Sequence, residues 1–488
     1  MVFPDLRQID QAWQQCRRRK RATTHAQFYE QRLLDNLIDT AQALNAGNWR
    51  PARPVCFIVT RPKGREIHAA AYRDRVVHHW LVPRLEALYE PVFIHDAYSN
   101  RQGKGTHAAV RRLQSFMHSL QSRHGAASPG YFLQLDVANF FVSLDRPLLF
   151  SLLQKRLGKA VRQGRIPLRE ACKLRWLCHR VLKQEVGREA RVLSSSRETQ
   201  CVPPHKRLLN APENKGLPIG NLTSQHFANV YLNELDQFVK HKLKCRYYLR
   251  YVDDMVLLHH DPEQLRQWHQ EIAAFLRERL MLELRPDALL APAGRGVDFL
   301  GYIVRPHYRL VRRRVIGNLH ERLRTFEKAH IMGQMQQHGA CLRIALETFE
   351  ALRSCLASYL GHFRHANSHR LILSLWEKWP WLGLFLDYAL KQEQLIPLWQ
   401  PRQVGGYRSQ VRFFRKLFPC AHVVVQRGCE MDAFPPWGDG HRLASALPAI
   451  RKEVRQLNVV EAGYLKGGLK RRVIDTFYLN SGVTLCRN

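Results

Sequence analysis

The feature that most constrains this chain is an Asp-Asp pair in a turn between two hydrophobic strands. Residues 247–259 have the pattern of strand, turn and strand, with Asp253 and Asp254 in the turn. Residues 131–137 also alternate in the manner of a strand, so Asp136 falls on a defined face of it. Laid side by side in one sheet, the two elements would bring the three carboxylates together.

Such a cluster suits one kind of chemistry. Nucleotidyl transfer uses two divalent cations roughly 3.5–4 Å apart, and Mg²⁺ demands hard oxygen ligands. Carboxylates gathered at one point repel one another without metal, so they are a poor structural choice. An Asp-Asp pair in a turn is ordinary by itself, because turns favour aspartate. The flanking strands, Tyr251 and the separate Asp136 together favour a metal site.

The charge of the chain indicates its partner. Its 488 residues include 76 Lys and Arg against 41 Asp and Glu, which gives a net charge of +35 and a pI near 10.3. A surplus of this size suits a partner with a dense row of phosphates, so a nucleic acid is expected. The alternative is a ribosome-associated or generally adhesive basic protein. The length is enough for about three domains of roughly 150 residues each, and the hydrophobic fraction of 45% is enough to bury a sizeable core.

Composition also predicts a cytoplasmic location and no membrane association. The first ten residues lack the apolar core of a secretory signal. The most apolar stretch, 379–390, is too short to span a hydrocarbon layer of roughly 30 Å. The 11 cysteines are odd in number and include no Cys-x-x-Cys pair, which favours reduced thiols over a zinc site or a disulfide framework.

Hydrophobic periodicity predicts the remaining elements. Helices are expected in 1–50, 72–90, 146–186, in the part of 216–240 that follows a turn, and beyond 306. A short strand at 56–60 leads into the basic turn 61–65, a long loop is expected at 187–214, and a composition change near 395 indicates a domain boundary.

Three motifs in order resemble one family. Asp136-Val-Ala-Asn-Phe-Phe141 and Tyr251-Val-Asp-Asp254 look like the palm of reverse transcriptases, with Gly216-Leu-Pro-Ile-Gly-Asn-Leu-Thr-Ser-Gln225 between them. Most of that family has Gln before the second glycine and Pro after the serine, where this chain has Ile219 and Gln225. This variant resembles the enzymes of diversity-generating retroelements, which copy a template RNA with frequent errors at adenines. The resemblance runs from about residue 58 to 367.

The resemblance implies an α/β right-hand polymerase. Its fingers, its palm of antiparallel sheet and helices, and its helical thumb would be followed by a small α/β C-terminal domain. The expected ranges are 1–130 for N-terminal helices and fingers, 131–305 for the palm with an inserted fingers segment at 146–215, 306–395 for the thumb, and 396–488 for the C-terminal domain.

The resemblance also implies roles for single residues. Asp136, Asp253 and Asp254 would be catalytic and, with Val137, would hold the metal. Residues expected to bind the nucleotide are Lys63, Arg65, Phe141, Ile219, Gly220 and Gln225, and those of the primer grip are Phe299, Leu300, Gly301 and Tyr302.

Some of these residues have simpler interpretations, and one expected group is missing. Phe141 could be ordinary core packing, and Lys63 and Arg65 could belong to a surface turn. The family's lysine, which protonates the leaving pyrophosphate, is replaced by Ala288, and nearby Arg285 hardly gives up a proton.

The tail resembles a second family. Residues 423–428 and 467–473 are similar to the mismatch-sensing domain of the mismatch-repair clamp protein, but Glu430-Met-Asp432 stands where that family has an aromatic wedge. The alternative is a small α/β module that binds duplex backbone or a partner. In both cases Lys466, Lys470, Arg471 and Arg472 are expected to contact nucleic acid.

The sequence therefore predicts an error-prone reverse transcriptase of a diversity-generating retroelement. It would use template RNA, a primer, deoxynucleoside triphosphates and two Mg²⁺ ions, with Mn²⁺ as the other usable ion, to make cDNA. The family implies a small basic accessory protein that forms a ring. Two alternatives stay open: a phage-defence or retron-like reverse transcriptase, and a non-catalytic RNA-binding protein on a polymerase scaffold.

Overall fold

The computed structural model describes residues 4–18, 20, 23–60, 63–125, 130–331, 341–389 and 392–397, together with the backbone of five strands after residue 422. The chain divides into two compact units. The first comprises Met1–Leu300 and Val304–His307, and the second comprises Gly301–Ile303 and Tyr308–Asn488.

The centre of the first unit is a four-stranded antiparallel sheet in the order β5-β6-β3-β7. Its strands are β3 (Tyr131–Leu135), β5 (Tyr247–Tyr251), β6 (Asp254–His259) and β7 (Leu289–Pro292). Leu135 pairs with Met255, and Gln134 pairs with Val256. The predicted hairpin and the predicted strand are therefore confirmed as neighbours in one sheet.

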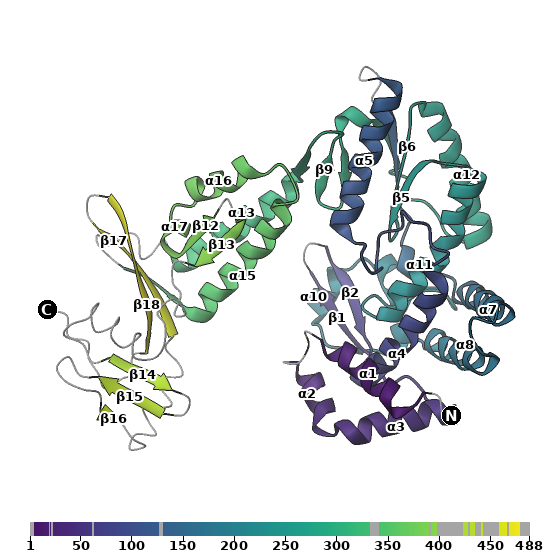
Figure 1. The fold of residues 1–488 in the computed structure, drawn as a ribbon, viewed down its shortest axis with the longest axis horizontal. Helices are drawn as coiled ribbons and strands as arrows, with labels where there is room; N and C mark the ends of the chain where they lie inside the picture. The colour runs from purple at the N-terminus through teal and green to yellow at the C-terminus, as the bar shows by residue number, and fades with distance from the viewer. Residues whose placement is uncertain are drawn as a thin grey trace. The chain divides into compact units, whose positions relative to one another are not determined.

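Helices cover both faces of this sheet (Figure 1). On one face lies α5 (Thr106–His124), where the Phe116 ring stands 5.3 Å from that of Tyr247. On the other lie α11 (Leu222–Gln237) and α12 (Pro262–Leu280). Helix α12 begins at Pro262 because the Asp261 side chain caps it, accepting a bond from the Glu263 amide at 2.9 Å.

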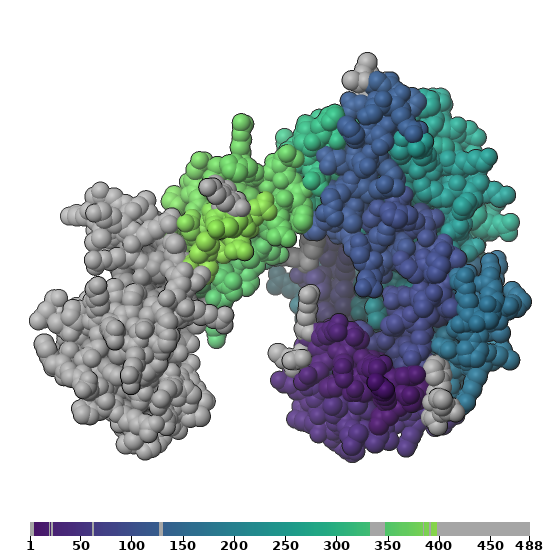
Figure 2. Space-filling model, viewed as in Figure 1, coloured from purple at the N-terminus to yellow at the C-terminus, as the bar shows by residue number. Residues whose placement is uncertain are grey.

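The N-terminal helices pack on a long buried helix. They are α1 (Leu6–Arg17), α2 (Thr24–Gln31) and α3 (Leu33–Ala46), and the buried helix is α4 (Tyr72–Tyr89). Trp80, Leu81 and Leu85 of α4 are almost wholly buried in the core that α4 shares with α11. In Figure 2 the N-terminal helices, in purple, form one continuous surface. The helices predicted for 1–50 and 72–90 are confirmed.

A second, smaller sheet has the order β2-β1-β4. It consists of β1 (Val55–Val59), β2 (Arg65–Ala69) and β4 (Arg191–Val192). Helices α7 (Arg146–Arg162) and α8 (Leu168–Lys183) follow β3 along the chain. The loop predicted for 187–214 is wrong in part. Strand β4 pairs in parallel with β1, and a capping box between Ser195 and Glu198 starts α10 (Ser196–Gln200).

The second unit has a helical core with strands added. Its helices include α13 (Arg313–His330), α15 (Leu346–Phe363), α16 (His369–Lys378) and α17 (Leu382–Phe385). Leu319, Leu356 and Phe363 are buried in this core. The helices expected beyond 306 are present, but strands that were not predicted lie among them. A short hairpin, β12 (Leu386–Ala389) and β13 (Gln394–Pro397), follows α17.

Strands also run across the boundary expected at 395. Strand β11 (Cys341–Ala345) pairs antiparallel with β17 (Asn458–Leu465), which pairs with β18 (Gly468–Tyr478). A separate sheet contains β14 (Val423–Arg427), β15 (Glu430–Phe434) and β16 (His441–Arg442). Composition predicted the boundary, but it carries no information on pairing between distant strands. None of the described helices is long and apolar enough to cross a bilayer.

Gly220 precedes α11 and lies close to Ile67 and His68 of β2, so a substitution there tests how closely the two segments pack. Its φ is +120°, and a Cβ there would lie 2.9 Å from Ile67 Cγ2 and 3.2 Å from the His68 carbonyl oxygen. Gly220→Ala is expected to reduce the free energy of unfolding by about 2 kcal/mol or more. Urea denaturation would measure the loss.

Gly103 is the matched control, because its φ is +72° but nothing lies within 4 Å of the position that a Cβ would take. Gly103→Ala should cost only the left-handed backbone term of about 1 kcal/mol. Equal losses at the two glycines would show that the approach of Gly220 to β2 is not a tight contact.

Candidate active site

Strand register places the three aspartates at one end of the sheet. Asp136 directly follows the Leu135–Met255 pair, and Asp254 directly precedes it on the other strand. Tyr251 pairs with Asp254, which leaves Val252 and Asp253 as the two residues of the turn. The convergence expected from the sequence is therefore present.

Electrostatics show how close these carboxylates are. Burial, together with the charges of Asp136 and Asp254, raises the pKa of Asp253 to about 7. Burial and the charge of Asp136 raise the pKa of Asp254 to about 6, while the positive charges of Lys63 and Arg285 oppose that rise. The three acids therefore repel one another at close range.

Arg285 is the cation that pairs directly with one of them. Its Nη1 donates to Asp136 Oδ2 at 3.1 Å, and its Nη2 lies 2.6 Å from Asp287. Its backbone amide also donates to the Asp136 carbonyl, at 2.8 Å. The ion pair is part exposed, with 42% of the Arg285 side chain accessible, so it contributes only about 0–1 kcal/mol and is readily displaced. Ala288 is half-buried against the core.

The residues present fit a magnesium site that is completed by substrate. Among the residues whose side chains are described, no group of three or more His, Cys, Asp or Glu forms a ready-made cage. Mg²⁺ is usually held by one or two carboxylates plus waters and substrate phosphates, and not by a cage of protein ligands alone. The mutual repulsion of Asp136, Asp253 and Asp254 is what a divalent cation would relieve. Val137 is buried and forms a bridge with Leu284.

The segment before α11 is attached to the small sheet through its backbone. The His68 amide donates to the Ile219 carbonyl at 2.7 Å, and the Ala70 amide donates to Asn221 Oδ1 at 3.1 Å. Gly220 is exposed, and the Ile219 side chain is half-buried. Gln225, in the first turn of α11, is also half-buried. Ile219 and Gly220 therefore lie beside β2.

The other residues expected to bind the nucleotide differ in exposure. Lys63 and Arg65 are exposed at the start of β2, and Lys63 lies close enough to Asp254 to affect its pKa. Phe141, in α6 (Phe140–Ser143), is half-buried and stands 5.2 Å from the Phe140 ring. Its backbone carbonyl accepts a hydrogen bond from the Leu217 amide at 2.7 Å. Phe141 therefore combines core packing with an accessible edge.

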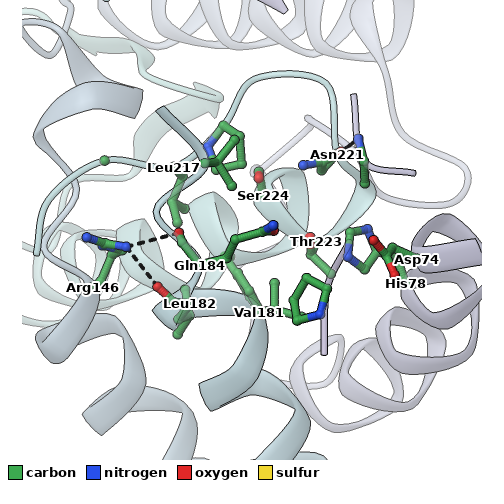
Figure 3. Close-up of a pocket in the computed structure, with 16 residues that line it drawn as sticks. Asp74, His78, Arg146, Val181, Leu182, Gln184, Leu217, Asn221, Thr223 and Ser224 are labelled. Atoms are coloured by element: carbon green, nitrogen blue, oxygen red, sulfur yellow. Dashed lines mark hydrogen bonds between the residues drawn. The ribbon is translucent and has the colours of Figure 1, made fainter. Parts of the chain in front are cut away.

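The pocket in Figure 3 is lined in part by the segment 216–221. Asp136, Asp253 and Asp254 are not among its lining residues. Buried Thr223 and Ser224 line it, with Asp74 and His78 of α4 on one side. Arg146 closes another side by donating to the carbonyls of Leu182 at 3.0 Å and Gln184 at 3.2 Å. Burial raises the pKa of Asp74 to about 6 and lowers that of His78 to about 3.

The residues expected to grip the primer are mostly buried. Phe299 of β8 (Val297–Phe299) in the first unit and Tyr302 of β9 (Tyr302–Val304) in the second are within their cores. The Tyr302 ring stacks on His362 at 4.2 Å, and its hydroxyl donates to the His362 carbonyl at 2.8 Å. Leu300 and Gly301 both have positive φ, and Leu300 is half-buried.

The basic residues of the tail are not tested by the structure. Lys466 lies outside the described residues, and Lys470, Arg471 and Arg472 are described only as backbone of β18. Arg250, a fully buried arginine in β5, is a further residue of this region that was not predicted from the sequence. The available signal was a charge within the otherwise apolar strand 247–251.

An antiparallel sheet with helices on both faces and clustered carboxylates at one end is an arrangement that suits template-directed nucleotidyl transfer. The chain belongs to the reverse transcriptase (RNA-dependent DNA polymerase) family, whose model matches residues 61–304. It is thus an RNA-directed DNA polymerase.

The chain is similar to other proteins over part of its length. It is 22% identical to protein YkfC of Escherichia coli (strain K12) over 311 residues, which cover 57% of this chain and 73% of YkfC. Among solved structures it is similar to apo telomerase from Candida tropicalis, at 10% identity and a TM-score of 0.38. That match covers 57% of this chain, which spans about 60% of the telomerase chain. A telomerase from Candida albicans superposes with a TM-score of 0.36 at 11% identity, covering 68% of this chain and 60% of the telomerase chain.

The raised pKa values predict how the metal-free protein responds to pH. A carboxyl whose pKa is higher in the folded state than its unfolded value of about 3.9 binds its proton more tightly when folded. Its stabilising contribution is complete below about pH 4 and is lost as the pH rises through the folded values. These values are about 7 for Asp253 and about 6 for Asp254.

With EDTA present, the free energy of unfolding is therefore expected to fall as the pH rises from about 5 to about 7.5. Asp253→Asn should flatten that fall, because the amide does not ionise. Asp35→Asn, at a side chain that is 58% exposed, is the control and should keep the slope of the native protein. Chemical denaturation at several pH values measures it, and an unchanged slope in Asp253→Asn would contradict the electrostatic account.

Proposed function

We propose that this reverse transcriptase is the error-prone enzyme of a diversity-generating retroelement. It would make adenine-mutagenised cDNA from a template RNA. The observation that carries the proposal is the segment 216–225, in which Ile219 and Gln225 replace the residues most of the family uses. Attachment of that segment to β2 supports it, because it sets Ile219 beside the strand that begins with Arg65.

In this proposal the three aspartates, with Val137, hold two Mg²⁺ ions. The chemistry that the metal pair supplies when bound is activation of the primer hydroxyl and neutralisation of charge on the transferred phosphate. The chain itself contributes carboxylate oxygens at the end of β3 and in the β5–β6 turn. Arg285 pairs with Asp136, and a bound cation would take over that charge compensation. Ala288 provides no proton, so the leaving pyrophosphate takes its proton from another source.

The surrounding residues would select and orient the nucleotide. Lys63 and Arg65, both exposed, would contact the triphosphate with fixed positive charge. The accessible edge of Phe141 would occupy the space of a ribose 2′-hydroxyl. Ile219 and Gly220 would lie against the templating base and the new pair. Replacing glutamine with isoleucine removes a polar group from that contact and relaxes discrimination.

The remaining partners are inferred from the family resemblance. The turn 299–302 would contact the primer end through its backbone, since its aromatic rings are buried. The tail, with Lys466, Lys470, Arg471 and Arg472, would contact duplex backbone, and a small basic ring-forming protein would assist synthesis. The net charge of +35 suits the nucleic-acid part of this assembly.

Primer extension tests the proposed role of the catalytic turn. Asp253→Ala is expected to reduce extension on an RNA template by on the order of a thousandfold, because it removes a carboxylate ligand of the metal ions that neutralise charge on the transferred phosphate. Asp35→Ala, a surface aspartate of α3, should extend like the native enzyme. Metal-dependent extension by Asp253→Ala at the native rate would refute the assignment.

The subtype is tested by sequencing the cDNA. Ile219→Gln is expected to lower misincorporation opposite template adenines severalfold, because a polar side chain is restored beside the new base pair. Leu209→Gln makes the same kind of substitution at an exposed leucine and should leave the error pattern unchanged. An adenine error frequency unaltered in Ile219→Gln would defeat this explanation. Native errors spread evenly over the four template bases would favour the retron-like alternative.

A further inference from the structure

The turn that carries Asp253 and Asp254 has an unfavourable backbone. Val252, the first of its two central residues, has a φ of +55°. This left-handed conformation is a genuine outlier for a β-branched residue, and it persists only where neighbouring groups enforce it. The direction of the following peptide, and hence the position of Asp253, depends on whatever holds Val252.

Arg250 makes that contact. Its Nη1 donates to the Val252 carbonyl oxygen at 2.9 Å, so the side chain reaches two residues forward to the turn of its own hairpin. The Arg250 side chain is completely buried and cannot touch a nucleotide or a template. It therefore acts on the turn from inside the protein.

A buried carboxylate keeps the guanidinium in place. Asp236 of α11 accepts from Arg250 Nε at 2.8 Å and from Nη2 at 2.7 Å, which is a bidentate pair. The Tyr248 hydroxyl donates to the same Asp236 Oδ1 at 2.8 Å. Asp236 uses Nε and Nη2 of the guanidinium, and the third nitrogen, Nη1, donates to the Val252 carbonyl. Only arginine has a planar fork of donors that can bind a carboxylate and a carbonyl at the same time.

Two further contacts attach this arrangement to the rest of the unit. Arg250 Nη1 also approaches Asn229 Oδ1 at 3.3 Å, and Asn229 is held by Ser99 through bonds of 3.1 and 2.8 Å. The Arg250 amide donates to the Asp96 carbonyl at 2.9 Å. Helix α11 and the segment 96–99 thus fix Arg250 from two sides.

We infer that Arg250 is a positioning residue for polymerisation, which holds the Val252 carbonyl so that Asp253 and Asp254 face the reacting groups. The inference rests on the proposed role of those aspartates. A purely structural ion pair would not need the bond to Val252. Buried pairs of this kind are often replaced by uncharged residues without loss of stability, so stability alone does not explain the pair.

That difference supplies the test. Arg250→Met leaves Asp236 buried and unpaired, so the melting temperature should fall by roughly 10 °C. Arg250→Met combined with Asp236→Asn removes both charges, and the amide oxygen introduced at position 236 can still accept from Tyr248. The double variant should recover most of the melting temperature. Its kcat should nevertheless remain lower by on the order of tenfold to a hundredfold, with the nucleotide KM within about twofold of native.

Arg250→Lys is a second variant, which tests the inference even if the Arg250→Met proteins fail to fold. Lysine keeps the charge against Asp236 but lacks the fork, so kcat should fall while the melting temperature changes little. The matched control is the pair Arg17 and Glu30, which is also bidentate, at 2.6 and 3.0 Å, and lies in the N-terminal helices. Replacing it with Met and Gln should leave kcat unchanged.

Native kcat in both the double variant and Arg250→Lys would overturn the inference. Asp253→Ala is assayed in parallel to separate the two proposals. Activity in Asp253→Ala would refute the catalytic turn itself. An inactive Asp253→Ala together with fully active Arg250 variants would refute only the positioning role.

Discussion

The pairing of Leu135 with Met255 determines where the carboxylates of Asp136 and Asp254 lie. Side chains alternate across a strand, so a shift by one residue would turn Asp136 to the opposite face of the sheet, away from Asp254. The observed register sets these two carboxylates side by side and adds Asp253 from the turn. Their repulsion is unfavourable in the protein alone, as the raised pKa values of Asp253 and Asp254 show.

Much of the first unit could be predicted from its sequence, because its elements have strong periodicity. The strand at 131–137 and the hairpin at 247–259 follow from alternation, and their joining follows from the need to bring acids together. The contact between Arg285 and Asp136 could not be predicted in this way. It arises because residues 283–285 run alongside Asp136, and strand pairing between distant segments leaves no local pattern.

The same limit explains why strand β4 and the pairing of β11 with β17 could not be predicted. Strand β4 is two residues long and forms by pairing in parallel with β1, so no local sequence pattern predicts it. Strand β11 pairs with β17 across the boundary that composition predicted at 395. A change in proline and glycine content locates a loop, but it does not show which strands meet on either side of it.

The site combines two ways of fixing a residue, and the difference has a consequence. Ile219 is held by its carbonyl, through the His68 amide, so its side chain can be exchanged without loosening the segment. The turn at Val252 is held by a side chain, Arg250, whose fork no other residue reproduces. A substitution at position 219 therefore leaves in place the contacts that hold the turn with Asp253 and Asp254. In the role proposed for Ile219, base selection would change there without a change in rate.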